Sequence, residues 1–442
     1  MLLKIRKVIT QLNQISSDDW PSIRRKLKRV LLLPLEIISL VIALFFVVII
    51  RLLSRIIIFR LAYLDIGRIG GTYPADLYLS EKKCGLYQGS YLDTFYFQNT
   101  INDTNQQWKK MWEREINVLF FSGLARSIER VNKLFPGYEK YQIPNSTLMP
   151  YREDYNKYLV SRDPAIYAKY NQHLESVLKA DQPNLSFTSE ENVLGERYLR
   201  EIGIPPKASF ICFHNRDSAY LDEVHSNYAW NYHDYRDSSI ENYLSAAEAI
   251  IKRGNYAVRL GSITIDKVKS TNPKLIDYAN NGKRTDFLDI YLSAKCKFIL
   301  CSDTGMSFPA EVFKRPLVYV NWTVLLRLPV YALNGLIIFK KFYLKNEKRF
   351  MSFSELIMFD FGGADTNEIF ANLGLEVIEN TPEEIRAVTM EMDDRLNGTW
   401  ESSEKDEDLQ QLFWALFGPD KLKSKDLRIG TEYLRNNKEL LG

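Results

Sequence analysis

Short apolar segments alternate with segments of helical spacing between residues 209 and 320, and this alternation constrains the fold more than any other feature of the sequence. The predicted strands are Ser209–Phe213, Tyr256–Leu260, Leu275–Tyr278, Phe298–Cys301 and Leu317–Val320. The predicted helices between them are Ile240–Lys252, Asp286–Ala294 and Met306–Phe313. Strands joined by helices build a parallel sheet that is covered on both faces. The sequence therefore predicts an α/β domain that binds its ligand beyond the carboxyl ends of the strands.

A chain of 442 residues is larger than one hydrophobic core usually supports, so we expect two globular domains and an appendage. The predicted division is an anchor over residues 1–60, a first α/β domain over 61–185, a second over 186–380, and helices over 381–442. Within the first domain, the pattern predicts strands and helices in this order: Leu61–Ile66 and Gly85–Tyr87 as strands, Trp108–Val118 and Leu124–Leu134 as helices.

Charge and cysteine content exclude several kinds of function. The 58 Lys and Arg residues nearly balance the 55 Asp and Glu residues, which gives no reason to expect a nucleic-acid partner. The four cysteines show no CxxC spacing, and the four histidines are scattered. We therefore expect free thiols in a reducing compartment and no metal site.

One apolar run, Leu31–Ile50, is twenty residues long, carries a single charge at Glu36, and is therefore a candidate membrane helix. Basic residues lie on both sides of it, so a transmembrane span and insertion into one leaflet both remain open. Leu52–Tyr63 has the spacing of an amphipathic helix, which would lie on an anionic membrane surface or pack on the first domain. The run begins too late for a cleaved signal peptide, so we expect an anchor in the cytoplasmic membrane with the domains facing the cytoplasm.

A second apolar stretch, Val324–Phe339, is interrupted by Pro329 and Gly335. It fits a core strand with a buried loop, and it also fits a membrane-facing surface that admits a lipid-linked acceptor.

Polar side chains follow the first predicted strand of the second domain at the point where a ligand would bind. Arg216 is suited to bidentate binding of a diphosphate that Asp217 orients, although an Arg–Asp pair that fixes the loop has the same pattern. Arg236, in the next loop, is either a second phosphate contact or an exposed loop residue. The donor site predicted at this edge also includes His214, Tyr220 and Arg259.

The segment from Cys301 to Ser307 runs from a strand through a tight turn into a helix. Hydroxyl and backbone N–H groups at such a turn bind anions, which makes Ser302, Asp303, Thr304 and Gly305 candidates for a phosphate site. Asp303 or Thr304 can equally be an ordinary helix cap. The nearby pair Asp286 and Asp289 fits acid–base chemistry or, more simply, bracing of the helix start.

Several of these segments, in this order and spacing, resemble a family of glycosyltransferases found in bacterial surface-polysaccharide gene clusters of the capsule or O-antigen type. The segments that carry the resemblance are IGRIGGTYPADLYL (66–79), QQWKKMW (106–112), RDSAYL (216–221), YRDSSIENYL (235–244), VRLGS (258–262), IDYA (276–279), TDFLDIYLSAKCKFILCSDTG (285–305), RPLVYVNW (315–322) and ENTPEEI (379–385). From first to last they span most of the chain after the apolar run.

The resemblance implies a GT-B glycosyltransferase with two Rossmann-like domains. It implies an acceptor on the first domain, a nucleotide-sugar donor on the second, final helices that pack back on the first domain, and neither metal nor cofactor. The acceptor would be a lipid-linked glycan or another surface glycan, and membrane lipids would be further partners. Gly70 and Gly71 match the acceptor loop, where the family usually has a His in place of Gly71, so Asp65 or Asp76 would have to replace it as the catalytic base.

Two other functions fit the same pattern. A nucleotide-sugar epimerase or hydrolase shares the fold and the phosphate-binding turn. A non-catalytic scaffold that binds sugar nucleotides would account for the missing His at Gly71.

Overall fold

The computed structural model describes residues 20–97, 105–143, 177, 182–224, 230–325, 328–329, 332–358, 367–417, 424 and 426–442, with the backbone alone for residues 20–35. The chain forms two compact units. The first comprises Met1–Asp65, Gln88–Asn99 and Ile116–Ser146, and the second comprises Ile66–Tyr87, Thr100–Glu115 and Thr147–Gly442. Each unit is described by itself.

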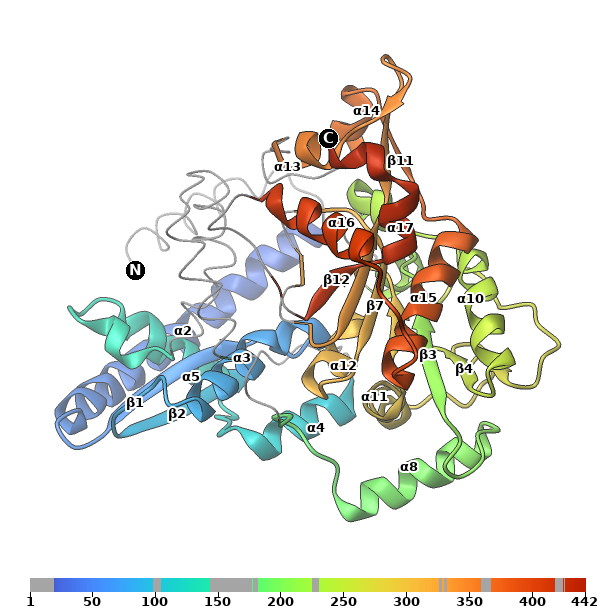
Figure 1. The fold of residues 1–442 in the computed structure, drawn as a ribbon. Helices are drawn as coiled ribbons and strands as arrows, with labels where there is room; N and C mark the ends of the chain where they lie inside the picture. Colours follow the sequence, from blue (N-terminus) through green and yellow to red (C-terminus); the bar gives the residue numbers. More distant parts are fainter. Residues whose placement is uncertain are drawn as a thin grey trace. The chain divides into compact units, whose positions relative to one another are not determined.

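The second unit is built on a seven-stranded sheet in the order β12-β8-β7-β6-β3-β4-β5, and every neighbouring pair is parallel (Figure 1). Its strands are β3 (Phe210–His214), β4 (Tyr256–Arg259), β5 (Leu275–Ile276), β6 (Ile299–Cys301), β7 (Leu317–Trp322), β8 (Gly335–Phe339) and β12 (Leu427–Ile429). The strands β4 and β5 extend the sheet on one side of β3, whereas β6, β7 and β8 extend it on the other. The strand order therefore reverses between β3 and β6, which is the topological switch point of the sheet.

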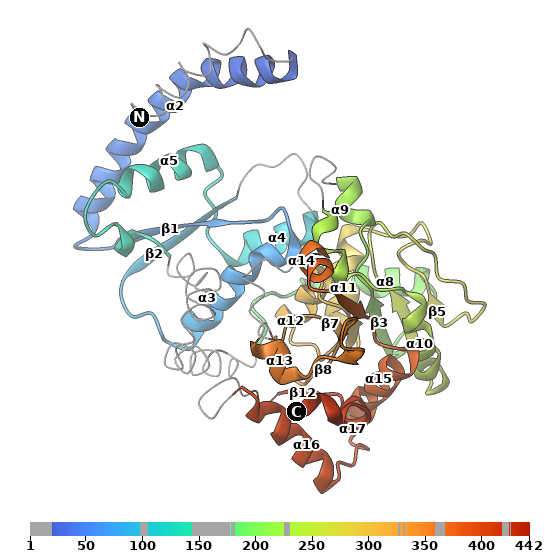
Figure 2. The same cartoon turned by 90° about the horizontal axis from the view of Figure 1, so that it is seen from above.

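Helices cover both faces of this sheet. From β3 the chain adds strands first on one side and then on the other, and right-handed connections in these two directions place their helices on opposite faces. The helix α10 (Glu241–Lys252) packs beside α15 (Pro382–Asn397) on one face. On the other face, α11 (Asp286–Lys295) contacts α12 (Phe308–Val312), α8 (Ser189–Glu201) and α4 (Gln106–Glu115) (Figure 2). The strands between are almost wholly buried, which explains why they read as continuous apolar runs.

Smaller elements of the second unit surround the sheet. The three-stranded antiparallel sheet β10-β9-β11 follows β8 along the chain. The remaining elements are η2 (Ile69–Thr72), α3 (Tyr73–Lys83), α9 (Ala219–Val224), η6 (Asn231–Arg236), η7 (Gly305–Ser307), β9 (Lys341–Leu344), β10 (Arg349–Phe350), α13 (Phe353–Met358), α14 (Asn367–Asn372), β11 (Leu375–Ile378), α16 (Glu404–Ala415), α17 (Thr431–Asn436) and η9 (Lys438–Leu441).

The C-terminal segment is tied to the sheet by buried polar groups. The Asp393 carboxylate on α15 accepts hydrogen bonds from Lys297 (2.6 Å) and Arg253 (2.9 Å). The side chains of Asn321 and Asn380 each accept a hydrogen bond from the other's backbone N–H, at 2.6 and 2.7 Å. These contacts join α15 to the strands of its own unit. The packing of the final helices on the first domain stays a prediction.

The first unit contains α2 (Trp20–Leu53), β1 (Ile58–Leu64), β2 (Tyr91–Phe97), α5 (Ser122–Asn132) and η3 (Tyr138–Tyr141). The strands β1 and β2 pair in parallel, and α2 packs along α5. Within the described residues this unit has a two-stranded sheet, so a second Rossmann-like domain is not confirmed. Among the residues that the structure describes, one helix is long and apolar enough to cross a membrane, over Glu36–Leu53, which by itself is weak evidence of membrane association.

The five strands predicted between Ser209 and Val320 are confirmed to within a few residues, as are their helices. Two predictions in the first half are wrong. Residues 58–63 of the predicted amphipathic helix Leu52–Tyr63 belong to β1, because alternate residues point inward and Arg60 is buried against Asp93 (2.6 Å). The predicted strand Leu61–Ile66 is confirmed over residues 61–64. The predicted strand Gly85–Tyr87 is irregular, with Gly85 in the left-handed region at φ 75°, and the strand follows at β2.

The stretch Val324–Phe339 is a core strand at its end, since all five residues of β8 are buried. Residues 326, 327, 330 and 331 of this stretch lie outside the described part, as do the side chains of the basic residues that precede the first apolar run. The boundaries predicted at residues 60, 185 and 380 stay predictions.

A close contact between α8 and α11 generates the first testable prediction. A Cβ on Gly195 would lie 2.2 Å from the Tyr291 ring, which is itself enclosed by Phe187 and Phe287. We expect Gly195→Ala to lower the free energy of unfolding by about 1–3 kcal/mol through overpacking. If nothing opposed the added methyl group, the better helix propensity of Ala would instead raise the free energy of unfolding by up to about 1 kcal/mol. The sign of the measured change therefore shows whether overpacking outweighs helix propensity.

Urea unfolding followed by circular dichroism measures this effect. Gly123→Ala on α5 is the control, because no atom lies within 4 Å of its added Cβ. A Gly195→Ala variant as stable as Gly123→Ala would contradict the tight packing of α8.

Candidate functional site

The loops that follow β3 and β6 meet at the switch point of the sheet, and Ser302 joins them. The backbone N–H of Arg216 donates to Ser302 Oγ (2.9 Å), and the backbone N–H of Ser302 donates to the His214 carbonyl (3.4 Å). Ser302 is fully buried. The structure therefore places this predicted donor residue beneath the site, where it positions the two loops.

Arg216 lies at the centre of this edge and is only 8% exposed. Its guanidinium forms an ion pair with Asp237, and its Nη2 lies 3.0 Å from His233 Nδ1. Burial, and then the neighbouring Arg236, lower the pKa of Arg216 to about 10, so it stays charged at neutral pH. The sequence pattern did not single out Asp237 or His233.

Asp217 has a different role from the one expected of it. Its carboxylate accepts hydrogen bonds from the backbone N–H groups of Ala219 and Ile265, both at 3.2 Å. It therefore joins the loops after β3 and β4, while Asp237 holds Arg216. Tyr220 lies on the short helix α9 and is half-buried.

Arg236 reaches the loop after β6. Its Nη2 donates to the Asp303 carboxylate at 2.7 Å and to the Asp303 carbonyl at 2.9 Å. Thr304 Oγ1 accepts from the backbone N–H of Met306 (3.0 Å), so the helix-cap alternative holds for Thr304. Gly305 is exposed, and its φ lies outside the left-handed region. Gly305 is therefore not needed for an unusual φ angle. Because it has no side chain, it leaves the backbone of this turn accessible to a ligand.

The predicted acceptor loop lies beside this turn. A Cβ on Gly305 would stand 4.0 Å from the backbone nitrogen of Gly70, and the 3₁₀ helix η2, which contains Gly70 and Gly71, contacts η7. The neighbouring Arg68 guanidinium lies over the Trp230 ring, 5.6 Å from its centroid. The structure thus brings the predicted donor turn and acceptor loop together within one unit.

The two predicted catalytic aspartates belong to different units. Asp76 is buried on α3, where Asn184 Nδ2 donates to its Oδ1 at 2.9 Å, and burial raises the pKa of the Asp76 carboxyl. Asp65 ends the first segment of the other unit. A catalytic role for either residue stays a prediction.

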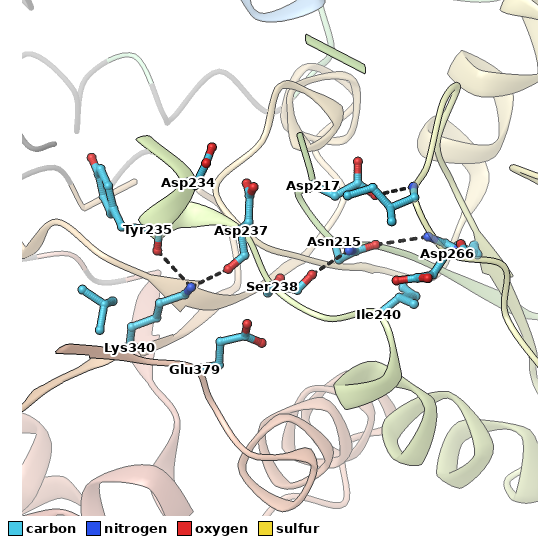
Figure 3. A pocket seen from close by; sticks show the side chains of 13 residues that line it. Asn215, Asp217, Asp234, Tyr235, Asp237, Ser238, Ile240, Asp266, Lys340 and Glu379 are labelled. Atoms are coloured by element: carbon cyan, nitrogen blue, oxygen red, sulfur yellow. Dashed lines mark hydrogen bonds between the residues drawn. The ribbon is translucent and has the colours of Figure 1, made fainter. Parts of the chain in front are cut away.

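A cavity of about 290 Å³ opens at the same edge of the sheet (Figure 3). Of the predicted donor residues, Asp217 and Arg259 line it. The full lining is Asn215, Asp217, Asp234, Tyr235, Asp237, Ser238, Ile240, Arg259, Ile265, Asp266, Lys340, Val377 and Glu379.

Lys340 is a lining residue that the sequence did not reveal. Its Nζ donates to the carbonyls of Tyr235 (2.9 Å) and Asp237 (2.5 Å), as the dashed lines in Figure 3 show. Burial lowers the pKa of Lys340 to about 8, while Glu379 opposes this shift. Lys340 is the first polar residue after β8, and it was missed because the sequence left Val324–Phe339 open between a core strand and a membrane-facing surface.

Arg259 is wholly buried behind the cavity. It donates to the Asp266 carbonyl, and its Nη2 lies 3.4 Å from Asn215 Oδ1. The Nε–H groups of Arg259 and Arg236 are buried and have no hydrogen-bond acceptor among the described residues. Buried guanidinium donors usually have partners, so this edge offers unmet donors to an oxygen-rich ligand.

Charge in the cavity lining is mixed. Five carboxylates (Asp217, Asp234, Asp237, Asp266 and Glu379) face two cations (Arg259 and Lys340). Carboxylates accept hydrogen bonds from hydroxyl groups, whereas the guanidinium groups of Arg216 and Arg236 suit phosphate oxygens. The arrangement suits a ligand with a hydroxyl-rich part and an anionic part.

Other predicted groups have structural roles. Asp289 accepts from Tyr278 OH (2.9 Å) and Arg284 (2.7 Å), and Asp286 accepts from the backbone of Gln106 (2.8 Å), which confirms bracing for this pair. Among the described residues, no three His, Cys, Asp or Glu side chains come together as a metal site. All four cysteine thiols are free.

The solved structures with limited similarity to this chain include two glycosyltransferases. No protein-family model matches the sequence, and no curated protein matches it. The glycosyl transferase family 9 structure from Veillonella parvula DSM 2008 aligns with 63% of this chain and 85% of its own, at 9% identity and a TM-score of 0.35. The E. coli ADP-heptose LPS heptosyltransferase II aligns with 77% of this chain and 99% of its own, at 13% identity and a TM-score of 0.38. TM-scores below 0.5 do not establish a shared fold, so the function is argued from the site.

His214, at the end of β3, generates a prediction about pH. Its Nδ1–H lies 3.0 Å from the Leu260 carbonyl, and burial lowers its pKa to about 4. Because the unfolded chain takes up this proton near pH 6.5, the folded state loses stability as pH falls from 6.5 to 4. We expect His214 to account for a loss of about 3 kcal/mol in this interval, and for none above pH 7.

Urea unfolding at several pH values measures this loss. His214→Asn keeps an N–H donor near the position of Nδ1 for the Leu260 carbonyl and removes the titration, so its stability should fall less steeply below pH 6.5. Parallel pH profiles for the two proteins would show that His214 is not buried in the neutral form.

Proposed function

We propose that this protein is a membrane-associated glycosyltransferase that moves a sugar from a nucleotide-sugar donor to a lipid-linked or surface-glycan acceptor. The observation that carries the proposal is the pair of guanidinium groups of Arg216 and Arg236 at the switch point of a parallel sheet. Both residues lie between β3 and α10 in the chain, and Arg236 reaches Asp303 in the loop after β6. Open α/β sheets bind nucleotides at this position. The resemblance to glycosyltransferases of surface-polysaccharide gene clusters supports the same assignment.

In this proposal, guanidinium groups and carboxylates bind different parts of the nucleotide sugar. Arg216 and Arg236 bind the diphosphate, and the carboxylates of the cavity accept hydrogen bonds from hydroxyl groups of the nucleoside or the sugar. Reaction breaks the bond between the anomeric carbon and the diphosphate oxygen, which keeps the electron pair. Fixed guanidinium charges stabilise the negative charge that develops there.

The acceptor hydroxyl approaches from the Gly70 and Gly71 loop, and a base removes its proton. Gly71 has no side chain, and the Asp76 carboxylate is engaged by Asn184. This observation favours one alternative function, a binding protein that holds a sugar nucleotide without transferring the sugar.

Donor binding tests the site directly. We expect Arg236→Gln and Arg216→Lys to weaken binding of the cognate nucleotide sugar by at least about tenfold, because each loses charge-assisted hydrogen bonds worth about 1.5–3 kcal/mol. Isothermal titration of the detergent-purified full chain with UDP-, GDP-, ADP- and CMP-sugars measures the dissociation constants.

Arg197→Gln on α8 is the control, because this side chain is 59% exposed on the surface. Circular dichroism establishes that each variant is folded. Folded Arg216→Lys and Arg236→Gln proteins that bind the donor as tightly as Arg197→Gln would place the diphosphate elsewhere.

Nucleotide release separates transfer from binding alone. A transferase releases nucleotide from the cognate donor when polyisoprenyl-phosphate-linked acceptors are added. Selective donor binding without acceptor-dependent release would support the binding protein instead.

A further inference from the structure

The helix α2 has one narrow face that packs against its own unit. Ala43 and Val47 are 0% and 1% exposed and contact Ile128 and Val131 of α5. Polar contacts extend this face in both directions along the helix. Ser39 Oγ lies 2.8 Å from Ser127 Oγ, and Arg51 Nε donates to Asn132 Oδ1 at 2.9 Å.

The rest of the helix surface is apolar and exposed. Val41, Phe45, Val48 and Leu52 recur every three or four residues and are 65%, 64%, 46% and 73% exposed. Ile38, Ile42, Leu44 and Phe46 widen the same surface. An apolar surface of this extent is covered by a membrane or a partner rather than left in water.

We propose that α2 does not cross the membrane but lies in the plane of one leaflet, with this exposed surface among the acyl chains and α5 on the aqueous side. The inference rests on the membrane association proposed above and specifies its geometry. It does not depend on the transfer reaction.

The contact with α5 excludes a span. From Ser39 to Arg51, α5 lies against α2 over about 20 Å of helix. Along this length α5 carries Arg126, Glu129 and Arg130, and Glu129 accepts a hydrogen bond from Tyr96 OH (2.6 Å) of the neighbouring strand. A transmembrane α2 would take these charged groups and the edge of a sheet into the hydrocarbon, where both are strongly disfavoured.

The part of the apolar run that precedes this contact is too short to span alone. Residues 30–38 cover about 14 Å as a helix, whereas the hydrocarbon core is about 30 Å thick. Within the described residues, α2 therefore has no stretch that is both long enough and free of α5.

The charges near the apolar surface identify the occupant as an anionic lipid surface. Arg55 is exposed directly after the apolar residues Leu52 and Leu53, and Arg24, Arg25, Lys26, Lys28 and Arg29 precede the apolar run in the sequence. Basic residues at both ends of an in-plane helix are suited to phospholipid headgroups on a single side of the bilayer. A second copy of the chain would bring these like charges together.

Cysteine labelling tests the geometry. In a Cys84→Ser background, which removes the exposed native thiol, Ser22→Cys and Arg55→Cys place one thiol on each side of the apolar run. A membrane-impermeant maleimide is added to intact spheroplasts and to sealed inverted membrane vesicles that contain the full chain. We expect both thiols to react in the same preparation and neither in the other until detergent is added.

Reaction of the two thiols in opposite preparations would show a span and overturn the inference, while leaving the membrane association intact. Recovery of the protein in the soluble fraction would overturn both, and donor binding would still test the enzyme assignment.

Charge on the apolar surface tests the contact with lipid. We expect Val41→Glu combined with Phe45→Glu to lower binding to phosphatidylglycerol–phosphatidylethanolamine vesicles at least about tenfold. Val193→Glu on α8 is the matched control, because Val193 is 70% exposed and lies in the other unit. Vesicle binding unchanged by the double substitution, or self-association of the wild-type chain that the substitution abolishes, would overturn the lipid assignment.

Discussion

The hydrogen bonds of Ser302 with the backbone after β3 are the contacts on which the candidate site depends. They join the two loops that diverge from the switch point, so the direction of each loop is set by the strand before it. Arg216 follows in one loop, and Asp303, which binds Arg236, follows in the other. The buried Tyr243 hydroxyl contacts Ser238 Oγ (3.0 Å) and Asn321 (3.3 Å). These buried hydrogen bonds connect the loop that contains Ser238 to strand β7.

Carboxylates hold the arginines of this edge in place. Asp237 pairs with Arg216, and Asp303 pairs with Arg236. A diphosphate would either displace these carboxylates or bind to guanidinium N–H groups that the carboxylates leave free. In both cases the ion pairs fix the position of each guanidinium before the ligand binds. Such preorganisation reduces the cost of ordering long side chains on binding.

Much of the sheet could be predicted because its strands are buried on both faces and therefore read as short apolar runs. β8 was obscured because its five residues end a longer apolar stretch that also fits a membrane surface. β12 was missed because it has three residues within a segment of helical pattern. β1 was predicted only in part. A strand was expected over Leu61–Ile66, but residues 58–60 were assigned to an amphipathic helix because Arg60 suggested a solvent-facing or lipid-facing side, whereas the structure buries it against Asp93.

The site was predictable in part for the same reason. Residues next to a predicted strand, such as Arg216 and Asp303, were found. Lys340 follows a stretch for which the sequence left two interpretations open, and Glu379 follows β11, which was not predicted. The partner of Arg216 could not be read from the sequence, because Asp217 is its neighbour in the chain and Asp237 reaches it only through the fold.

Hydrogen–deuterium exchange on the full chain in detergent tests most directly whether a nucleotide sugar binds at the junction of β3 and β6. With the nucleotide sugar that binds most tightly, the account predicts slower exchange in peptides that cover residues 214–218, 235–238 and 302–307. Protection confined to other segments, or no protected segment with any of the UDP-, GDP-, ADP- and CMP-sugars at millimolar concentration, would contradict it.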